Sequence, residues 1–226
     1  MIHEKLLNPE SIVVVGGSNH LNKPGGKLIR NLTDHKYGGK LYIVNPREKE
    51  VQGFPAYASV EDLPEVDLAI LAIPAAACLP AMEVLIREKQ TRAFIVISAG
   101  FSEMGHEGKL LEQQMARMVD EVEGTLIGPN CIGVMNPVHT SVFTTPITPL
   151  CSKGCDFISG SGATAVFIMA AGIPKGLRFS SVWSVGNSAQ TGVEEVLAHL
   201  DETFDPEHSS LVKLLYLETI RNPDKL

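Results

Sequence analysis

The chain is poor in the features that mark several common classes of protein. It has four cysteines and one tryptophan among 226 residues, and aromatic residues make up 6%. No apolar run approaches the roughly twenty residues that a membrane-spanning helix requires. Its 19 lysines and arginines, against 26 acidic residues, form no basic run of the kind that binds nucleic-acid phosphates. We therefore expect neither a membrane nor a nucleic-acid partner.

The few cysteines also limit the chemistry of the chain. Cys78 and Cys131 lie in apolar stretches typical of buried free thiols. Cys151 and Cys155 have no matching cysteine or histidine pair at zinc spacing, so we expect neither a structural disulfide nor a metal site. No signal-peptide apolar region follows Met1 to Lys5. These features predict a cytoplasmic protein.

What the chain does have is 44% hydrophobic residues, enough for one large domain or two small ones. Its short apolar runs are continuous, which favours parallel strands buried on both faces, and helical segments separate them. We expect strands at 11–15, 40–44, 67–73, 93–98 and 125–127, and helices near 25–35, 75–90 and 106–122. This order predicts an α/β domain with a Rossmann-like, doubly wound parallel sheet.

A stretch with several prolines and little charge, residues 136–150, interrupts this rhythm and predicts a crossing between domains. A second α/β unit follows, with strands at 155–158, 179–185 and 211–217 and helices near 162–172 and 191–200. So few strands make a short sheet, so we expect the second domain to be truncated. The predicted boundaries are 1–137 for the first domain, 138–150 for the linker and 151–226 for the second domain.

The turn after the first strand is rich in glycine. Gly16 to Ser18 follow the apolar run, and Lys23 to Gly26 lead into the next helical segment. Glycine lets the backbone approach a ligand closely, and the N–H groups at a helix start attract phosphate. The turn therefore indicates a nucleotide-like ligand. The alternative is a helix start that binds nothing.

Two well-known nucleotide fingerprints do not match. The glycine spacing differs from G-x-G-x-x-G, and the second strand ends in Asn45-Pro46-Arg47, without the carboxylate that holds a ribose hydroxyl in dinucleotide sites. Arg47 places a cation there, which suits an adenosine with phosphate on its ribose. The phosphate loop of nucleoside triphosphatases fails too, because Leu28 stands where serine or threonine holds magnesium.

Small residues and prolines follow the other strands of the first unit as well. Ligands of doubly wound sheets lie beyond the carboxyl ends of the strands. The segments at these ends include Ile73-Pro74, Ser98-Ala99-Gly100-Phe101 and Gly128-Pro129-Asn130-Cys131. Together they predict an open floor for a long, thin ligand, and ordinary turn chemistry is the alternative.

A second turn of small residues, Ser159 to Thr164, opens the first helix of the second unit. Two serines, two glycines and a helix N-terminus form a cradle of backbone N–H groups, which suits phosphate or an acyl phosphate. A serine that merely caps the helix is the other interpretation. A hydrolase nucleophile is disfavoured, since Ser159 stands where G-x-S-x-G needs its first glycine.

In order and spacing these segments resemble the nucleoside-diphosphate-forming acyl-CoA synthetases, the family that includes the alpha subunit of succinyl-CoA synthetase. The resemblance covers essentially the whole chain. It is carried by Val15-Gly16-Gly17-Ser18, Lys23, Gly25, Asn31-Leu32, Val44-Asn45-Pro46, Ile73-Pro74, Ser98 to Glu103, Gly128 to Gly133, Ser159 to Gly162, Gly186-Asn187 and Tyr216 to Ile220. It implies a CoA-binding domain followed by a flavodoxin-like ligase domain.

The resemblance also implies roles for particular residues. CoA would lie across the strand ends of the first domain, on Gly16, Ser18, Lys23, Gly25, Asn45, Pro46, Arg47, Ile73, Pro74, Ser98, Ala99 and Gly100. Phosphate would lie on Ser159, Gly160, Ser161 and Gly162, and the catalytic set would be Glu218, Ser159, Ser161 and Asn130. Glu218 matches the family glutamate that orients the imidazole of a phosphohistidine.

The implied reaction interconverts acyl-CoA, nucleoside diphosphate and phosphate with acid, CoA and nucleoside triphosphate, through acyl phosphate and phosphohistidine. ATP or ADP and magnesium would bind to an ATP-grasp domain or beta subunit outside this chain, and we expect an oligomer. Two departures stand out. Gly160 replaces the glutamine or arginine common in the family, and the phosphohistidine loop is expected beyond Leu226. We therefore expect this chain alone to bind but not to catalyse.

Two other interpretations stay open at this point. One is a non-catalytic module that senses CoA or a nicotinamide nucleotide, and the missing carboxylate after the second strand argues against the nicotinamide version. The other is a stand-alone subunit whose catalytic histidine is supplied by a separate chain. None of the seven histidines lies in a glycine-rich loop, and His106 is most simply an exposed residue at a helix start.

Overall fold

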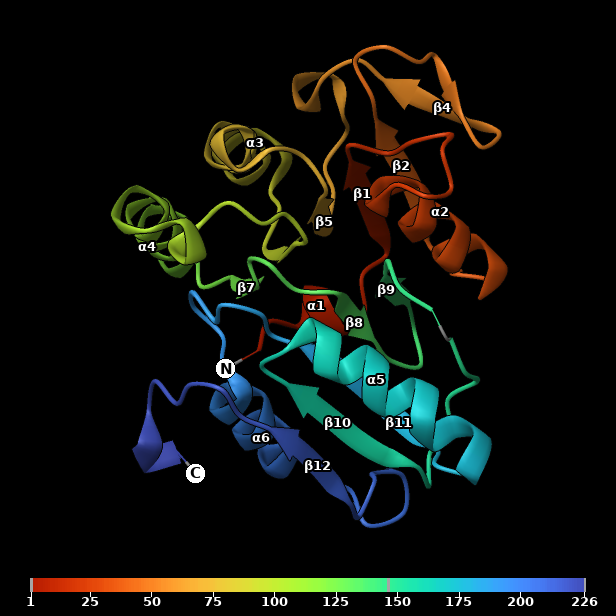
Figure 1. Ribbon diagram of the computed structural model, residues 1–226. Helices are drawn as coiled ribbons and strands as arrows, with labels where there is room; N and C mark the ends of the chain where they lie inside the picture. Colours follow the sequence, from red (N-terminus) through yellow and green to blue (C-terminus); the bar gives the residue numbers. More distant parts are fainter. Residues whose placement is uncertain (1, 146, 226) are drawn as a thin grey trace.

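The computed structural model describes residues 2–145 and 147–225, which form two sheets stacked along the molecule (Figure 1). Within these residues the first sheet has seven strands in the order β3-β4-β2-β1-β5-β6-β7. Their bounds are Ser11–Val15 for β1, Lys40–Val44 for β2, Glu50–Val51 for β3, Phe54–Tyr57 for β4, Leu68–Leu71 for β5, Ala93–Val96 for β6 and Thr125–Ile127 for β7. All neighbours pair in parallel except β3 and β4, which confirms the doubly wound parallel sheet.

The helices cover both faces of this sheet, as continuous apolar strands require. On one face, α1 (Glu4–Leu7) and α2 (Pro24–Asp34) bury Leu6 and Leu28 against Ile12 and Val14. On the other face, α3 (Ala75–Lys89) and α4 (His106–Asp120) bury residues such as Met82 and Met115. Figure 1 shows α3 and α4 on one side of the strands and α2 on the other.

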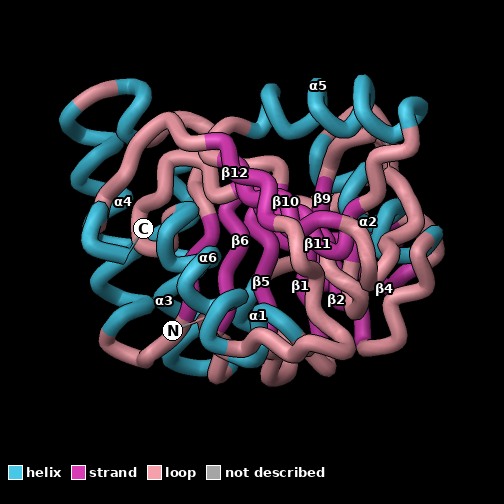
Figure 2. The backbone as a smooth tube through the Cα atoms, turned by 90° about the horizontal axis from the view of Figure 1, so that it is seen from below, coloured by secondary structure: helices cyan, strands magenta, loops and turns pink. Residues whose placement is uncertain are grey.

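The second sheet has the order β12-β10-β11-β8-β9 among the described residues. Its strands are β8 (Gly133–Met135), β9 (Thr140–Val142), β10 (Cys155–Ser159), β11 (Phe179–Ser184) and β12 (Lys213–Tyr216). Strands β10, β11 and β12 are parallel, whereas β8 and β9 are antiparallel. Helices α5 (Gly162–Gly172) and α6 (Val193–Glu202) lie on opposite faces of this sheet (Figure 2).

Sequence patterns missed α1 and both hairpins, β3–β4 and β8–β9, because elements of two to four residues carry no readable periodicity. The β8–β9 hairpin matters most, since it gives the second sheet two strands that its own segment lacks. It also reaches the first unit, where Nδ2 of Asn31 in α2 lies 2.6 Å from the carbonyl oxygen of Val142. The boundaries at residues 137 and 150 stay predictions.

His139 lies at the junction of the two units. Its Nε2 is 2.8 Å from the carbonyl oxygen of Leu6, and its Nδ1 is 2.8 Å from Oγ of Ser141. A carbonyl only accepts, so the neutral ring donates from Nε2 and accepts at Nδ1. Burial lowers the pKa of His139 to about 4. One apolar cluster, from Ile2 to Val196, runs through this junction and joins the two sheets.

The structure also shows the surroundings of the cysteines and of His106. Cys78 and Cys131 are buried, as predicted, and the four cysteines are free thiols. Over the described residues, the structure contains no helix with the length and apolar character that crossing a membrane demands. His106 is exposed at the first residue of α4, as the sequence indicated.

Candidate functional site

The glycine loop after β1 is shaped by close packing of the strand end against the start of α2. Gly16 has φ +89°, a conformation that favours glycine. A Cβ added to Gly25 would lie 2.0 Å from the carbonyl oxygen of Gly16. No side chain fits between these two backbones, so α2 begins directly above the end of β1.

Neighbouring side chains then hold the loop in place. Nε2 of Gln52, in the β3–β4 turn, donates to the carbonyl oxygens of Ser18 at 2.8 Å and Gly26 at 2.9 Å. Nδ2 of Asn45 donates to the carbonyl oxygen of Gly17 at 2.8 Å. Asn45 also accepts at Oδ1 from the backbone N–H of Arg47. Both amides are thus used to fix the loop, and Gln52 is a residue that sequence reasoning missed.

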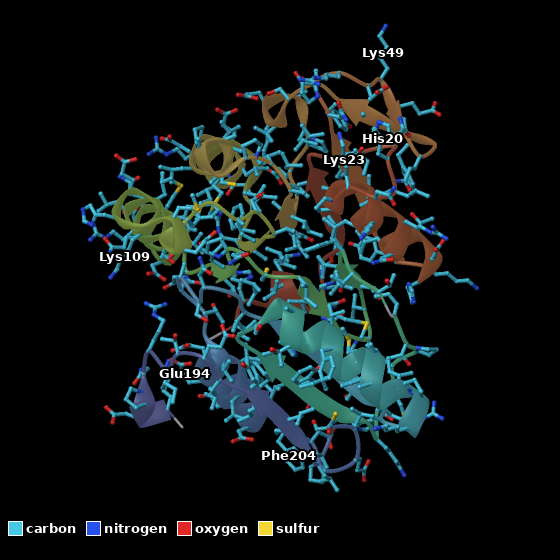
Figure 3. All side chains as sticks on the ribbon, viewed as in Figure 1. His20, Lys23, Lys49, Lys109, Glu194 and Phe204 are labelled. Atoms are coloured by element: carbon cyan, nitrogen blue, oxygen red, sulfur yellow. The ribbon has the colours of Figure 1, made fainter. Side chains whose placement is uncertain are left out.

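A first cavity of about 610 Å³ opens beside this loop. It is lined by Gly16, Pro46 and Ile73 from the expected set, together with apolar residues that include Val60 and Val84. Lys23 and Arg47 are exposed near the same strand ends. In the described part of the chain, neither of these two side chains has a recorded hydrogen bond or ion pair. Figure 3 shows Lys23 near the start of α2, whereas Lys49 points away from the molecule.

The next strand ends lead from the first cavity toward the second sheet. Oγ of Ser98, after β6, donates to the carbonyl oxygen of Ile73, after β5. Ala99 is exposed, and Gly100 has φ +107°. Ile73 lines the first cavity, and Ile97, one residue before Ser98, lines a second one. The linings of the two cavities therefore include residues at the ends of neighbouring strands, β5 for the first cavity and β6 for the second.

The second cavity, of about 480 Å³, lies where the carboxyl ends of both sheets face each other. It is lined by Asn130, Ser161 and Glu218 from the expected catalytic set, and by Gly160 and Gly162. Thr219, Ser102 and Asn187 also line it. The structure thus brings together residues that are as far apart in sequence as Ser102 and Thr219. Sequence reasoning assigned no role to Ser102, Asn187 or Thr219, although all three stand in segments that carry the resemblance.

The turn Ser159 to Gly162 forms the floor of this cavity. Ser159 is fully buried, and its Oγ donates to the carbonyl oxygen of Ser161 at 2.7 Å. Ser161 is the N-cap of α5, and its Oγ accepts from the backbone N–H of Thr164 at 3.4 Å. For the N–H groups of Gly162 and Ala163, no acceptor is recorded within the described ranges. These unpaired donors at a helix N-terminus suit an anion.

Gly160 and Glu218 face each other across this turn. A Cβ added to Gly160 would lie 3.4 Å from the backbone N of Glu218, an ordinary contact. A longer side chain at this position would therefore project toward Glu218. Glu218 itself is exposed on the loop after β12, and no hydrogen bond to its carboxylate is recorded among the described residues. The carboxylate remains available to a further group.

Fold and cavities together define a class of protein. It is a two-sheet α/β protein with a glycine loop at one end of a strand edge and an open helix N-terminus at the other. The family model described as CoA binding domain matches residues 10–137, and the one described as succinyl-CoA ligase like flavodoxin domain matches residues 152–226. The chain belongs to the nucleoside-diphosphate-forming acyl-CoA synthetase family.

Individual relatives agree with this placement. The alpha subunit of the ADP-forming acetate–CoA ligase II of Pyrococcus furiosus is 37% identical over 216 residues, which is 95% of this chain and 46% of that protein. The ADP-forming acetate–CoA ligase I of Archaeoglobus fulgidus is 35% identical, over 98% of this chain and 32% of that protein. The chain thus spans less than half the length of these curated relatives.

Solved structures show the same arrangement. The apo form of the dinucleotide-forming acetyl-coenzyme A synthetase 1 of Ca. Korarchaeum cryptofilum superposes with a TM-score of 0.86 at 31% identity, covering 97% of this chain and 47% of that one. A crystal structure from Pyrococcus horikoshii OT3 gives a TM-score of 0.87 at 36% identity, covering 98% of this chain and 50% of that one. Both sheets are therefore shared with these proteins.

Proposed function

We propose that this chain is the CoA-binding part of an acyl-CoA synthetase, with CoA lying from the first cavity to the second. The observation that carries the proposal is that the two cavities lie at the ends of neighbouring strands, with Ile73 after β5 lining the first and Ile97 after β6 lining the second, and that Ser98 links these strand ends by its hydrogen bond to Ile73. A long ligand with phosphates at one end and a reactive group at the other suits such an edge.

The first cavity fits the adenosine end of CoA. Apolar side chains such as Val60 and Val84 suit the adenine ring, and the cations of Lys23 and Arg47 suit phosphates. Asn45 stands where a dinucleotide site has its ribose-binding carboxylate, and its amide is already engaged by the glycine loop. Both features favour CoA over a nicotinamide nucleotide.

The second cavity fits the chemistry that the intact enzyme would perform. When bound, CoA supplies the thiol that accepts an acyl group. The N–H groups of Gly162 and Ala163 are placed to hold phosphoryl oxygens, and Asn130 presents a polar amide to the same cavity. Glu218 is placed to orient an imidazole contributed by another part of the enzyme. Ser159 supports this set only through the fold of the turn, since its hydroxyl is buried.

The intact protein would interconvert a carboxylic acid, CoA and nucleoside triphosphate with acyl-CoA, nucleoside diphosphate and phosphate. Relatives are named for acetate, feruloyl-CoA and 4-hydroxybutyrate, so we limit the substrate class to carboxylic acids. Because two relatives are alpha subunits, we propose that an ATP-grasp domain or beta subunit provides the nucleotide site and magnesium, in an oligomer.

Calorimetric titration with CoA, dephospho-CoA and NAD tests the binding part of this proposal. We expect CoA to bind most tightly and dephospho-CoA about tenfold more weakly, because it lacks the ribose phosphate that Arg47 suits. NAD binding tighter than CoA would overturn the assignment. Formation of acyl-CoA by the intact protein then separates a synthetase from a non-catalytic CoA sensor.

A further inference from the structure

A cluster of polar side chains joins the two sheets at the edge of the second cavity. We call it the amide relay, and its members are Ser102, Glu103, Glu112, Asn130 and Asn187. Nδ2 of Asn187, after β11, lies 2.6 Å from Oε1 of Glu112 and 2.7 Å from Oε2 of Glu103. On its other side, Oδ1 of Asn187 lies 3.2 Å from Nδ2 of Asn130. The relay thus spans α4, the loop after β7 and the loop after β11.

The two carboxylates decide which way the Asn187 amide faces. An ionised carboxylate only accepts hydrogen bonds, so two of them on one side require the NH₂ group of Asn187 on that side. The pKa of Glu103 lies below its ordinary value, because hydrogen bonds from Gly100 and Asn187 outweigh the opposing effect of burial. Oδ1 of Asn187 therefore faces Asn130.

The orientation of Asn130 follows from that of Asn187. Since Oδ1 of Asn187 only accepts, Asn130 must present its NH₂ group to it. That group has two N–H bonds, and the contact with Asn187 uses one. Asn130 is exposed, lines the second cavity and has φ +57°, which is a strained conformation for a residue other than glycine. Its second N–H is left as a donor at the cavity.

Glu112 is the anchor of the relay. It is only 7% exposed, although it lies within helix α4, and its Oε1 also accepts from the backbone N–H of Ser102 at 3.1 Å. The backbone of Asn187 is fixed independently, because its N–H donates to the carbonyl oxygen of Pro129 at 2.9 Å. Both ends of the relay are therefore held by rigid elements, which suits a group that must be oriented before it reacts.

We propose that Asn187 is a positioning residue for acyl transfer. Glu112 and Glu103 fix its amide, and its amide fixes Asn130 as a hydrogen-bond donor to the carbonyl or phosphoryl oxygen of the reacting acyl group. This inference rests on the proposed function and adds to it two residues, Asn187 and Glu112, that act without touching the substrate.

The test uses the intact enzyme with the substitution Asn187→Asp. This change keeps the shape of the side chain but places a third carboxylate against Glu103 and Glu112, and their repulsion displaces it from Asn130. We expect kcat for acyl-CoA formation to fall about 10- to 100-fold, in the range of a lost oxyanion donor, with the KM for CoA unchanged within about twofold. Exchange of label between ADP and ATP, which does not use the acyl group, should stay at the wild-type rate.

A compensating variant separates positioning from a merely structural role. In the triple variant Glu103→Gln, Glu112→Gln and Asn187→Asp, both new amides donate to the new carboxylate, and that carboxylate still accepts from Asn130. We expect kcat to recover to within about fivefold of the wild type. The matched control is Gln113→Glu, which adds the same charge at an exposed neighbour on α4 and should leave kcat unchanged. If Asn187→Asp does not fold, Asn187→Ala, which removes the acceptor that orients Asn130, should still lower kcat at constant KM.

The outcomes are distinct. A wild-type enzyme that forms no acyl-CoA contradicts the proposed function. A wild-type enzyme that forms acyl-CoA, with Asn187→Asp and Asn187→Ala both within twofold of its kcat, overturns the relay and leaves the proposed function standing. Equal losses in acyl-CoA formation and nucleotide exchange, with no rescue in the triple variant, also overturn it, because a structural role lowers both.

Discussion

The two turns of small residues look alike in sequence but are built for different reasons. At the glycine loop after β1, glycine is required by packing, since a Cβ on Gly25 would lie 2.0 Å from the Gly16 carbonyl oxygen. At the turn after β10, a Cβ on Gly160 would make an ordinary contact at 3.4 Å. The first loop is closed by its own chain, through Gln52 and Asn45, whereas the second is left open to a cavity.

This difference separates two ways in which a helix start serves a ligand. The glycine loop shapes a surface on which a ligand lies, with its charges supplied by the side chains of Lys23 and Arg47. The turn after β10 instead offers the N–H groups of Gly162 and Ala163 directly to the cavity. Glycine at a strand end therefore does not by itself indicate a contact with phosphate.

The strongest test of this contrast is Gly25→Ala. Overlap with the Gly16 carbonyl must push α2 away from β1, and overpacking of this kind costs up to about 3 kcal/mol of unfolding free energy. Chemical denaturation measures the loss. Gly38→Ala is the control, because no atom lies within 4 Å of its added Cβ. A loss below about 1 kcal/mol for Gly25→Ala would show that the loop is not closed by packing.

A second prediction concerns His139, at the junction of the two units, and the pH dependence of the free energy of unfolding. The pKa of His139 is lowered to about 4 by burial, so protonation favours the unfolded chain. Its contribution is present above about pH 6.5 and is lost as the pH falls toward 4, with about 2 kcal/mol lost by pH 5. His139→Gln should remove that part of the pH dependence in denaturation at pH 7 and pH 5. Equal slopes in both proteins would mean that His139 is protonated in the fold.

A smaller effect is expected at Gln52, which closes the glycine loop from the β3–β4 turn. Its amide makes two hydrogen bonds to loop carbonyls, so Gln52→Ala should cost about 1.5 kcal/mol and weaken CoA binding. Gln114→Ala, at an exposed position on α4, serves as the control. If Gln52→Ala binds CoA as tightly as the wild type, the shape of the glycine loop does not contribute to CoA binding.

The smallest effect is expected for Gly160→Ala at the open turn. The added methyl group meets Glu218 at a normal distance, and the position has no positive φ, so the free energy of unfolding should change by less than about 0.5 kcal/mol. Denaturation beside Gly25→Ala gives the comparison in one experiment. A loss equal to that of Gly25→Ala would erase the distinction between the two turns.

Much of this arrangement is readable in the sequence, and the parts that are not have physical reasons. Continuous apolar runs and glycine or proline breaks located β1, α2 and α5 within a residue or so. The sequence did not predict the β8–β9 hairpin, because strands of three residues are too short to show a periodic pattern of apolar residues. Glu112 escaped because a glutamate within a helix ordinarily faces solvent, yet here it is buried by the loop after β11. Only the structure shows that the Ser159 hydroxyl and the Asn45 amide already make hydrogen bonds within the chain.

The most direct test of CoA binding along this strand edge is a crystal structure of the chain with CoA. We predict the adenine ring in the first cavity, beside Gly16 and Pro46, and the sulfur in the second cavity, beside Asn130 and Gly162. CoA bound in the reverse direction, or bound away from both cavities, would contradict the proposed binding mode.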